Sequence, residues 1–105
     1  MSSLKQQIEM VAAWAAANPK IETAFIVGSR ATKTERPDSD LDVAITLTER
    51  FGYGDWLFES DEWEADLQKM SPFKIHLLRG GGSLPNQIVQ QAIEAHGVLA
   101  FERTK

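Results

Sequence analysis

The sequence predicts a small α+β domain with a sheet of about four strands. Three segments repeat apolar residues at helical spacing, and four shorter segments are alternating or continuously apolar, as in strands. The 105 residues suffice for one hydrophobic core and leave no room for a second. We therefore expect a single domain over residues 1–105.

The composition excludes several classes of protein. With 15 acidic and 11 basic residues the formal net charge is −4, which argues against broad nucleic-acid binding. The absence of cysteine excludes disulfides and thiolate metal sites. No apolar run approaches the ~20 residues of a membrane span, and the first residues do not resemble a signal peptide. We expect a cytoplasmic protein without membrane contact.

The first predicted element is an amphipathic helix over residues 4–17, which ends before Asn18-Pro19. Trp14 lies off its apolar stripe, so we expect this side chain to be a subunit contact or a partly covered surface residue. The stripe itself consists of Leu4, Ile8, Val11, Ala12 and Ala15.

Two strands are predicted next, at residues 22–28 and 40–48, with a short helical turn at 29–34 between them. The first strand has a continuous apolar run and breaks at Gly28. The second is entered through a turn at Pro37-Asp38 and alternates strictly. Period two places Asp40 and Asp42 on one face. The other face receives Leu41, Val43, Ile45 and Leu47.

The second half of the chain predicts a helix at 55–70, a strand at 73–79, a helix at 84–96 and a strand at 98–101. The glycines at 80–82 with Ser83 predict a loop. The helix at 55–70 has one base, Lys69, and six acids, so we expect either a solvated face or a docking surface for a basic partner. Its acids are Asp55, Glu59, Asp61, Glu62, Glu64 and Asp66.

The stretch from Gly28 to Asp42 contains the residues best suited to chemistry. Gly28 permits a close backbone approach, and with Ser29 it can cradle a phosphate. Two carboxylates on one strand face, Asp40 and Asp42, are costly neighbours unless a cation lies between them. Magnesium is commonly held by carboxylates together with substrate phosphates. The alternative is a simple turn at Gly28 and a polar loop before an ordinary strand.

A basic spot lies within the same stretch. Arg30, Lys33 and Arg36 fall within the loop that leads to the two aspartates. Such a local cluster suits a triphosphate better than a polymer. For Lys33 and Arg36, solvated loop charges are an equally good interpretation, whereas Arg30 adjoins Ser29.

This pattern, Gly28-Ser29-Arg30 followed by Asp40-Leu41-Asp42, resembles the nucleotidyltransferase superfamily that includes DNA polymerase beta, and most of all its minimal bacterial and archaeal members. The resemblance spans about residues 22–102 and implies a small mixed sheet with helices mainly on one face. It also implies that Asp40 and Asp42 bind Mg2+, or Mn2+ instead, and that Gly28, Ser29 and Arg30 bind the nucleotide. In this family a hydroxyl attacks the α-phosphorus and pyrophosphate leaves.

His76 departs from the family pattern. A third carboxylate usually stands on the later strand, where this chain has Ile75-His76-Leu77. Alternation places His76 on the face of the two aspartates if the strands are neighbours. Four interpretations remain open: His76 is the general base, the site prefers manganese or another softer ion, nucleotide binds without transfer, or His76 only hydrogen-bonds to an aspartate.

The resemblance implies transfer of a nucleoside monophosphate, AMP from ATP, to a hydroxyl of a partner macromolecule. Minimal members are often paired with a small helical HEPN-type protein in toxin–antitoxin modules, so we expect such a partner or a homodimer. The alternative is a weak or inactive transferase that neutralises or regulates a partner as a binding module. A nucleotide-sensing regulator is a third possibility.

Overall fold

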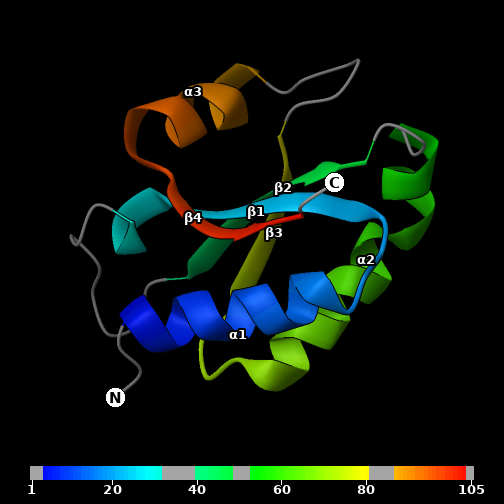
Figure 1. Cartoon of the computed structure of the whole chain (residues 1–105), viewed down its shortest axis with the longest axis horizontal. Coiled ribbons are helices and arrows are strands. Elements are labelled where there is room, and N and C mark those ends of the chain that lie inside the picture. The colour runs from blue at the N-terminus through cyan, green and yellow to red at the C-terminus, as the bar shows by residue number, and fades with distance from the viewer. Residues whose placement is uncertain (1–3, 32–39, 49–52, 81–86, 104–105) are drawn as a thin grey trace.

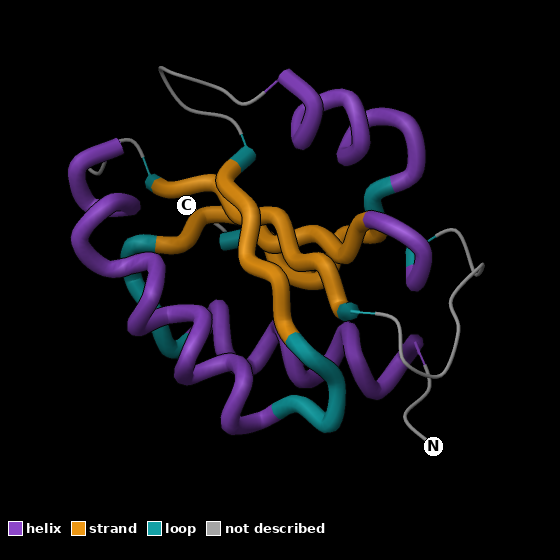
Figure 2. Tube along the Cα trace, turned by 180° about the vertical axis from the view of Figure 1, so that it is seen from behind, coloured by secondary structure: helices purple, strands orange, loops and turns teal. Residues whose placement is uncertain are grey.

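The computed structural model describes residues 4–31, 40–48, 53–80 and 87–103. A four-stranded sheet lies between two layers of helix (Figure 1). Helices α1 (Leu4–Ala16) and α2 (Tyr53–Met70) cover one face, and α3 (Gln87–His96) covers the other. The same arrangement is seen from behind in Figure 2. The α+β prediction, with helices mainly on one face of a mixed sheet, is confirmed.

The sheet has the strand order β3-β2-β1-β4. Its strands are β1 (Ile21–Val27), β2 (Leu41–Leu47), β3 (Ile75–Arg79) and β4 (Val98–Glu102). β1 is antiparallel to both β2 and β4, whereas β2 and β3 are parallel. Parallel neighbours need a long crossover, which α2 provides. All four predicted strands are present, with ends shifted by one or two residues.

The alternation of β2 separates two cores. Val43 and Ile45 are fully buried in the larger core, together with Val11 of α1 and Leu67 of α2. A smaller cluster on the opposite face joins Val27, Ala44 and Val89 of α3. The face that receives Asp42 is therefore the α3 face of the sheet.

Trp14 corrects the sequence prediction. It is a core residue, only 6% exposed, and its Nε1 donates a hydrogen bond of 3.1 Å to the carbonyl oxygen of Trp63. The physical reason is that α1 packs against both the sheet and α2, so a residue off the main stripe still faces another element. The expectation of a surface or subunit-contact tryptophan was wrong.

Several predicted features lie outside the described residues: the turn at Pro37-Asp38, the bases Lys33 and Arg36, and most of the glycine-rich loop at 80–83. The predicted turn at 29–34 is described only at its start, where Gly28–Arg30 form the 3-10 helix η1. Within the described ranges, no helix has the length and apolar character needed to cross a membrane.

Candidate functional site

The two halves of the sequence motif meet at the end of β1. Antiparallel pairing places Val27 beside Asp42, so Gly28 follows directly next to the start of β2. Gly28 has a φ of +75°, and a Cβ atom there would lie 2.3 Å from Oδ2 of Asp42. Glycine is thus required for its backbone conformation and for the close approach of the carboxylate. Gly28, predicted to bind phosphate, and Asp42, predicted to bind a metal ion, are therefore direct neighbours.

His76 lies on the other side of Asp42. The parallel register pairs the two residues, and Nδ1 of His76 is 3.5 Å from Oδ1 of Asp42. The His76 side chain is 60% exposed, whereas that of Asp42 is 27% exposed. β2 and β3 are neighbours, which is the condition under which the sequence placed His76 on the face of Asp42. The chemical role of His76 stays a prediction.

The environment of Asp42 disfavours its charge. Burial raises the pKa of the Asp42 carboxyl, and the negative charge of Asp40 raises it further. The nearby His76 lowers the same pKa, through its charge and through a hydrogen bond, and so offsets part of the effect. A cation bound at the carboxylates would favour the ionised form in the same way as His76.

The donor set fits a divalent cation that is completed by substrate. Among the residues that the structure describes, no three acidic, histidine or cysteine side chains gather closely enough to hold a metal. Magnesium is often held by only one or two carboxylates plus substrate phosphates. Asp40 and Asp42, the latter beside the Gly28 backbone, match that partial set and not a closed protein cage.

Arg30 is held by packing and does not extend freely into solvent. It is 5% exposed, and its guanidinium carbon lies 3.6 Å from the centroid of the Phe73 ring. This contact attaches η1 to the segment just before β3, the strand of His76. Its predicted role in phosphate binding stays a prediction. The side chain of Ser29 is outside the described part of the chain.

Sequence reasoning missed His96. The Gly28 amide donates a hydrogen bond of 3.4 Å to Nε2 of His96, the last residue of α3. The contact arises because α3 packs on Val27 and Ala44, which places its carboxyl end beside the end of β1. No local spacing predicts it, since the two residues are far apart in sequence. His96 therefore joins the site through tertiary packing alone.

A family model matches most of the chain. The model of the polymerase beta nucleotidyltransferase family matches residues 9–105. The chain belongs to this family. No curated protein matches its sequence significantly.

Solved structures show the same fold. A toxin–antitoxin structure with AMP-PNP has a TM-score of 0.65 at 14% identity, covering 92% of this chain and 74% of the other. The MntA–HpeT toxin–antitoxin, in a variant with two aspartates changed to glutamate, has a TM-score of 0.59 at 13% identity, covering 88% and 70%. A protein from Sulfolobus solfataricus assigned as a nucleotidyltransferase has a TM-score of 0.50 at 19% identity, covering 95% and 80%.

Proposed function

We propose that this family member transfers a nucleoside monophosphate, AMP from ATP, to a hydroxyl of a partner macromolecule. The observation that supports this most directly is the contact between Gly28 and Asp42. In this proposal the backbone turn at Gly28 binds a phosphate of the donor, and the neighbouring Asp42 carboxylate binds the cation that accompanies it. The nucleotide in one solved neighbour is AMP-PNP, which is consistent with ATP as the donor.

We assign a separate role to each group of site residues. The backbone at Gly28 and Ser29, with Arg30, holds the triphosphate, and Asp40 and Asp42 hold Mg2+ or Mn2+. The bound cation would neutralise the phosphates and favour ionisation of the attacking hydroxyl. A bond then forms from the acceptor oxygen to the α-phosphorus, the bond to the β-phosphate oxygen breaks, and pyrophosphate leaves with the electron pair.

His76 accepts the proton of the acceptor hydroxyl in this proposal. Its Nδ1 faces Asp42, so Nε2 on the far side of the ring is available to an incoming group. The His76 side chain is 60% exposed, which leaves room for an acceptor, and an imidazole is a common general base in enzymes. A histidine can therefore supply the proton-accepting step that relatives assign to a third carboxylate.

A protein partner is the acceptor that the comparisons favour. Two of the solved neighbours are toxin–antitoxin assemblies. By analogy we propose a partner of the HEPN type, with a second copy of this chain as the alternative acceptor. The two aspartates altered in the MntA–HpeT variant are separated by a single residue, as are Asp40 and Asp42.

The decisive test is Asp42→Asn. The protein, a candidate partner and each α-labelled nucleoside triphosphate are incubated with magnesium or manganese, and label on the partner is measured. Asp42→Asn should abolish labelling while far-UV circular dichroism stays native. Asp61→Asn, which removes an exposed acid of α2, is the matched control and should label normally. Transfer retained by Asp42→Asn would refute the assignment.

A second candidate function is stoichiometric binding of a partner without transfer. It is favoured by His76, which stands where relatives place a third acid and is a poor ligand for magnesium. The double variant Asp40→Asn, Asp42→Asn separates the two functions. Neutralisation of the partner that survives both substitutions supports the binding module, and its loss supports the enzyme.

A further inference from the structure

A groove runs between α1 and α2, on the side of the sheet away from Asp42. Its volume is about 450 Å³. Apolar side chains of both helices, including Trp14, Trp63 and Met70, line it. Three carboxylates of α2 also line it: Glu59, Glu62 and Asp66. The groove thus combines apolar walls, to which two largely buried tryptophans contribute, with acids that all come from one helix.

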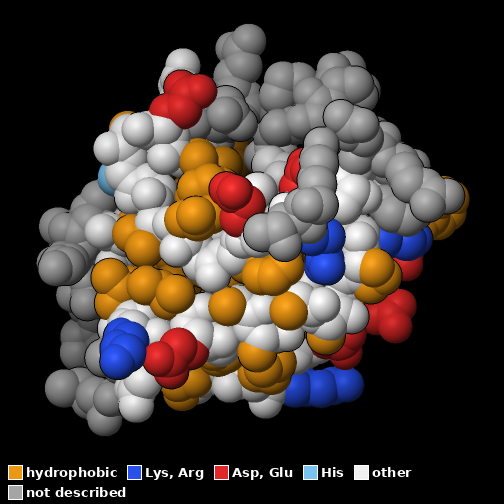
Figure 3. Space-filling model, viewed as in Figure 1, with side chains coloured by type: hydrophobic (Ala, Val, Ile, Leu, Met, Phe, Trp, Pro, Cys, Tyr) orange, Lys and Arg blue, Asp and Glu red, His pale blue; other side chains and the backbone are white. Residues whose placement is uncertain are grey.

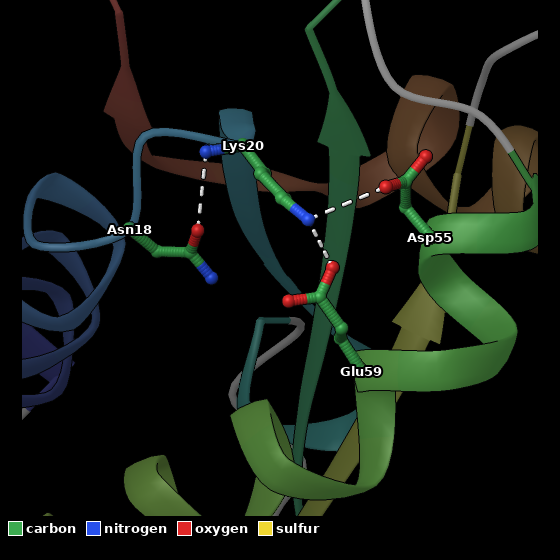
Figure 4. Close-up of polar contacts among 4 residues, drawn as sticks. All are labelled: Asn18, Lys20, Asp55 and Glu59. Atoms are coloured by element: carbon green, nitrogen blue, oxygen red, sulfur yellow. Dashed lines mark hydrogen bonds and ion pairs between the residues drawn. The ribbon is translucent and has the colours of Figure 1, made fainter.

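The acids of α2 do not all serve the same purpose. The ammonium of Lys20 pairs with Asp55 at 3.3 Å and with Glu59, which ties the start of β1 to α2 (Figure 4). Glu64 accepts a hydrogen bond of 3.4 Å from the Leu77 amide of β3. These three acids stabilise the fold, so only part of the acidic surface of α2 is left for other contacts.

Glu62 and Asp66 are the groove acids that remain available. Both are accessible to solvent, and Asp66 has only an exposed pair with Lys69 at 3.8 Å, which contributes little. Acidic side chains gather over α2 at the right of Figure 3. The rim of the groove is therefore negative while its walls are apolar.

We propose that this groove binds a basic amphipathic helix of a partner protein. Lysine and arginine side chains have apolar stems and cationic ends, which match apolar walls with an acidic rim. A volume of this size accepts side chains from one face of a helix, as in other helix-in-groove complexes. The same acids repel nucleic acid.

The probe is a labelled helical peptide of about 15 residues, long enough to form a helix, with leucine on one stripe and lysine and arginine beside it. Binding to the full chain is measured by fluorescence anisotropy and by the emission of the groove tryptophans. Glu62→Lys and Asp66→Lys should each weaken binding about threefold, and together about tenfold. Ala13→Phe should also weaken it, since it fills the groove without a change of charge.

Asp61→Lys is the matched control, because Asp61 is the exposed neighbour of Glu62 on α2 but does not line the groove. It should leave the affinity within about twofold of the original. Equal weakening by Asp61→Lys, equal binding of a peptide with glutamate in place of its bases, or no binding at all would overturn the proposal. Self-association that Glu62→Lys disrupts would instead identify a second copy as the occupant.

The result is independent of the transfer chemistry. Asp42→Asn lies outside the groove and should bind the peptide like the original chain, even where labelling is lost. Glu62→Lys should bind ATP unchanged. Loss of peptide binding in Asp42→Asn would show that the variant is misfolded, and circular dichroism of both proteins identifies that case.

Discussion

The close contact between Gly28 and Asp42 can be measured through Gly28→Ala. The backbone at position 28 has a φ of +75°, and a left-handed conformation costs a residue with a side chain about 1–2 kcal/mol. The new Cβ would lie 2.3 Å from Oδ2 and 3.2 Å from Cγ of Asp42. Overpacking of this kind costs about 1–3 kcal/mol. We expect the free energy of unfolding to fall by about 2–5 kcal/mol.

The two contributions separate in an Asp42→Ala background. That substitution removes Oδ2 and Cγ and leaves only Cβ, 3.4 Å from the new methyl group, which is near ordinary contact. Gly28→Ala should then cost only the backbone term of about 1–2 kcal/mol. The double-mutant cycle therefore predicts a coupling energy of about 1–3 kcal/mol between the two positions.

Gly54→Ala is the control, because a Cβ at Gly54, in the first turn of α2, would meet nothing within 4 Å. Gly54→Ala should not lower the free energy of unfolding, and the higher helix propensity of alanine should raise it by up to about 1 kcal/mol. Urea denaturation followed by far-UV circular dichroism and tryptophan fluorescence gives each free energy. A cost for Gly28→Ala that is the same in both backgrounds would refute the carboxylate contact. A cost below about 1 kcal/mol would refute the left-handed backbone.

Three further variants test the site and the larger core. Asp42→Asn should raise the Tm at pH 7, because burial raises the pKa of the Asp42 carboxyl in the folded state, and the folded state therefore loses stability as the pH rises through this pKa. The gain in Tm should shrink toward pH 4, where the Asp42 carboxyl is protonated in the folded state. A gain in Tm that does not change with pH would contradict the raised pKa. Trp14→Phe should lower the free energy of unfolding by about 1–3 kcal/mol, because the smaller ring gives up buried contacts and the indole hydrogen bond to the carbonyl of Trp63; an unchanged denaturation midpoint would contradict the contact. Arg30→Lys retains the charge but loses the planar guanidinium over Phe73, so the free energy of unfolding should fall by about 1 kcal/mol in urea denaturation. An unchanged free energy of unfolding would show that only the charge of Arg30 matters.

The sequence predicted the fold and one side of the site because both depend on local patterns. The strict alternation of apolar and other residues in β2 identified the face that is buried in the larger core. Asp42 was therefore assigned to the opposite face. The glycine at position 28 was recognised from the break in an apolar run. The same alternation placed His76 on the face of Asp42 on the condition that β2 and β3 are neighbours, and the parallel register of the two strands meets that condition.

Other parts of the site could not be predicted, because they depend on how whole elements pack. Trp14 is off a single helical stripe, yet α1 has two neighbours and buries it. His96 reaches Gly28 only because α3 packs over Val27, a contact between residues far apart in sequence. Arg30 was predicted to bind the nucleotide from its position beside Ser29, whereas its burial against Phe73 depends on the position of a later segment.

The groove and the site lie at opposite ends of β1. Pro19, which lines the groove, comes just before the strand, and Gly28 follows its last residue. Seven residues of strand span about 20 Å, and the two features also lie on different faces of the sheet. A helix in the groove cannot itself present a hydroxyl to Asp42, so the acceptor must be a different segment of the same partner. Groove variants should therefore raise the partner concentration needed for half-maximal transfer and leave the maximal rate intact, whereas Asp42→Asn should abolish the rate with docking intact.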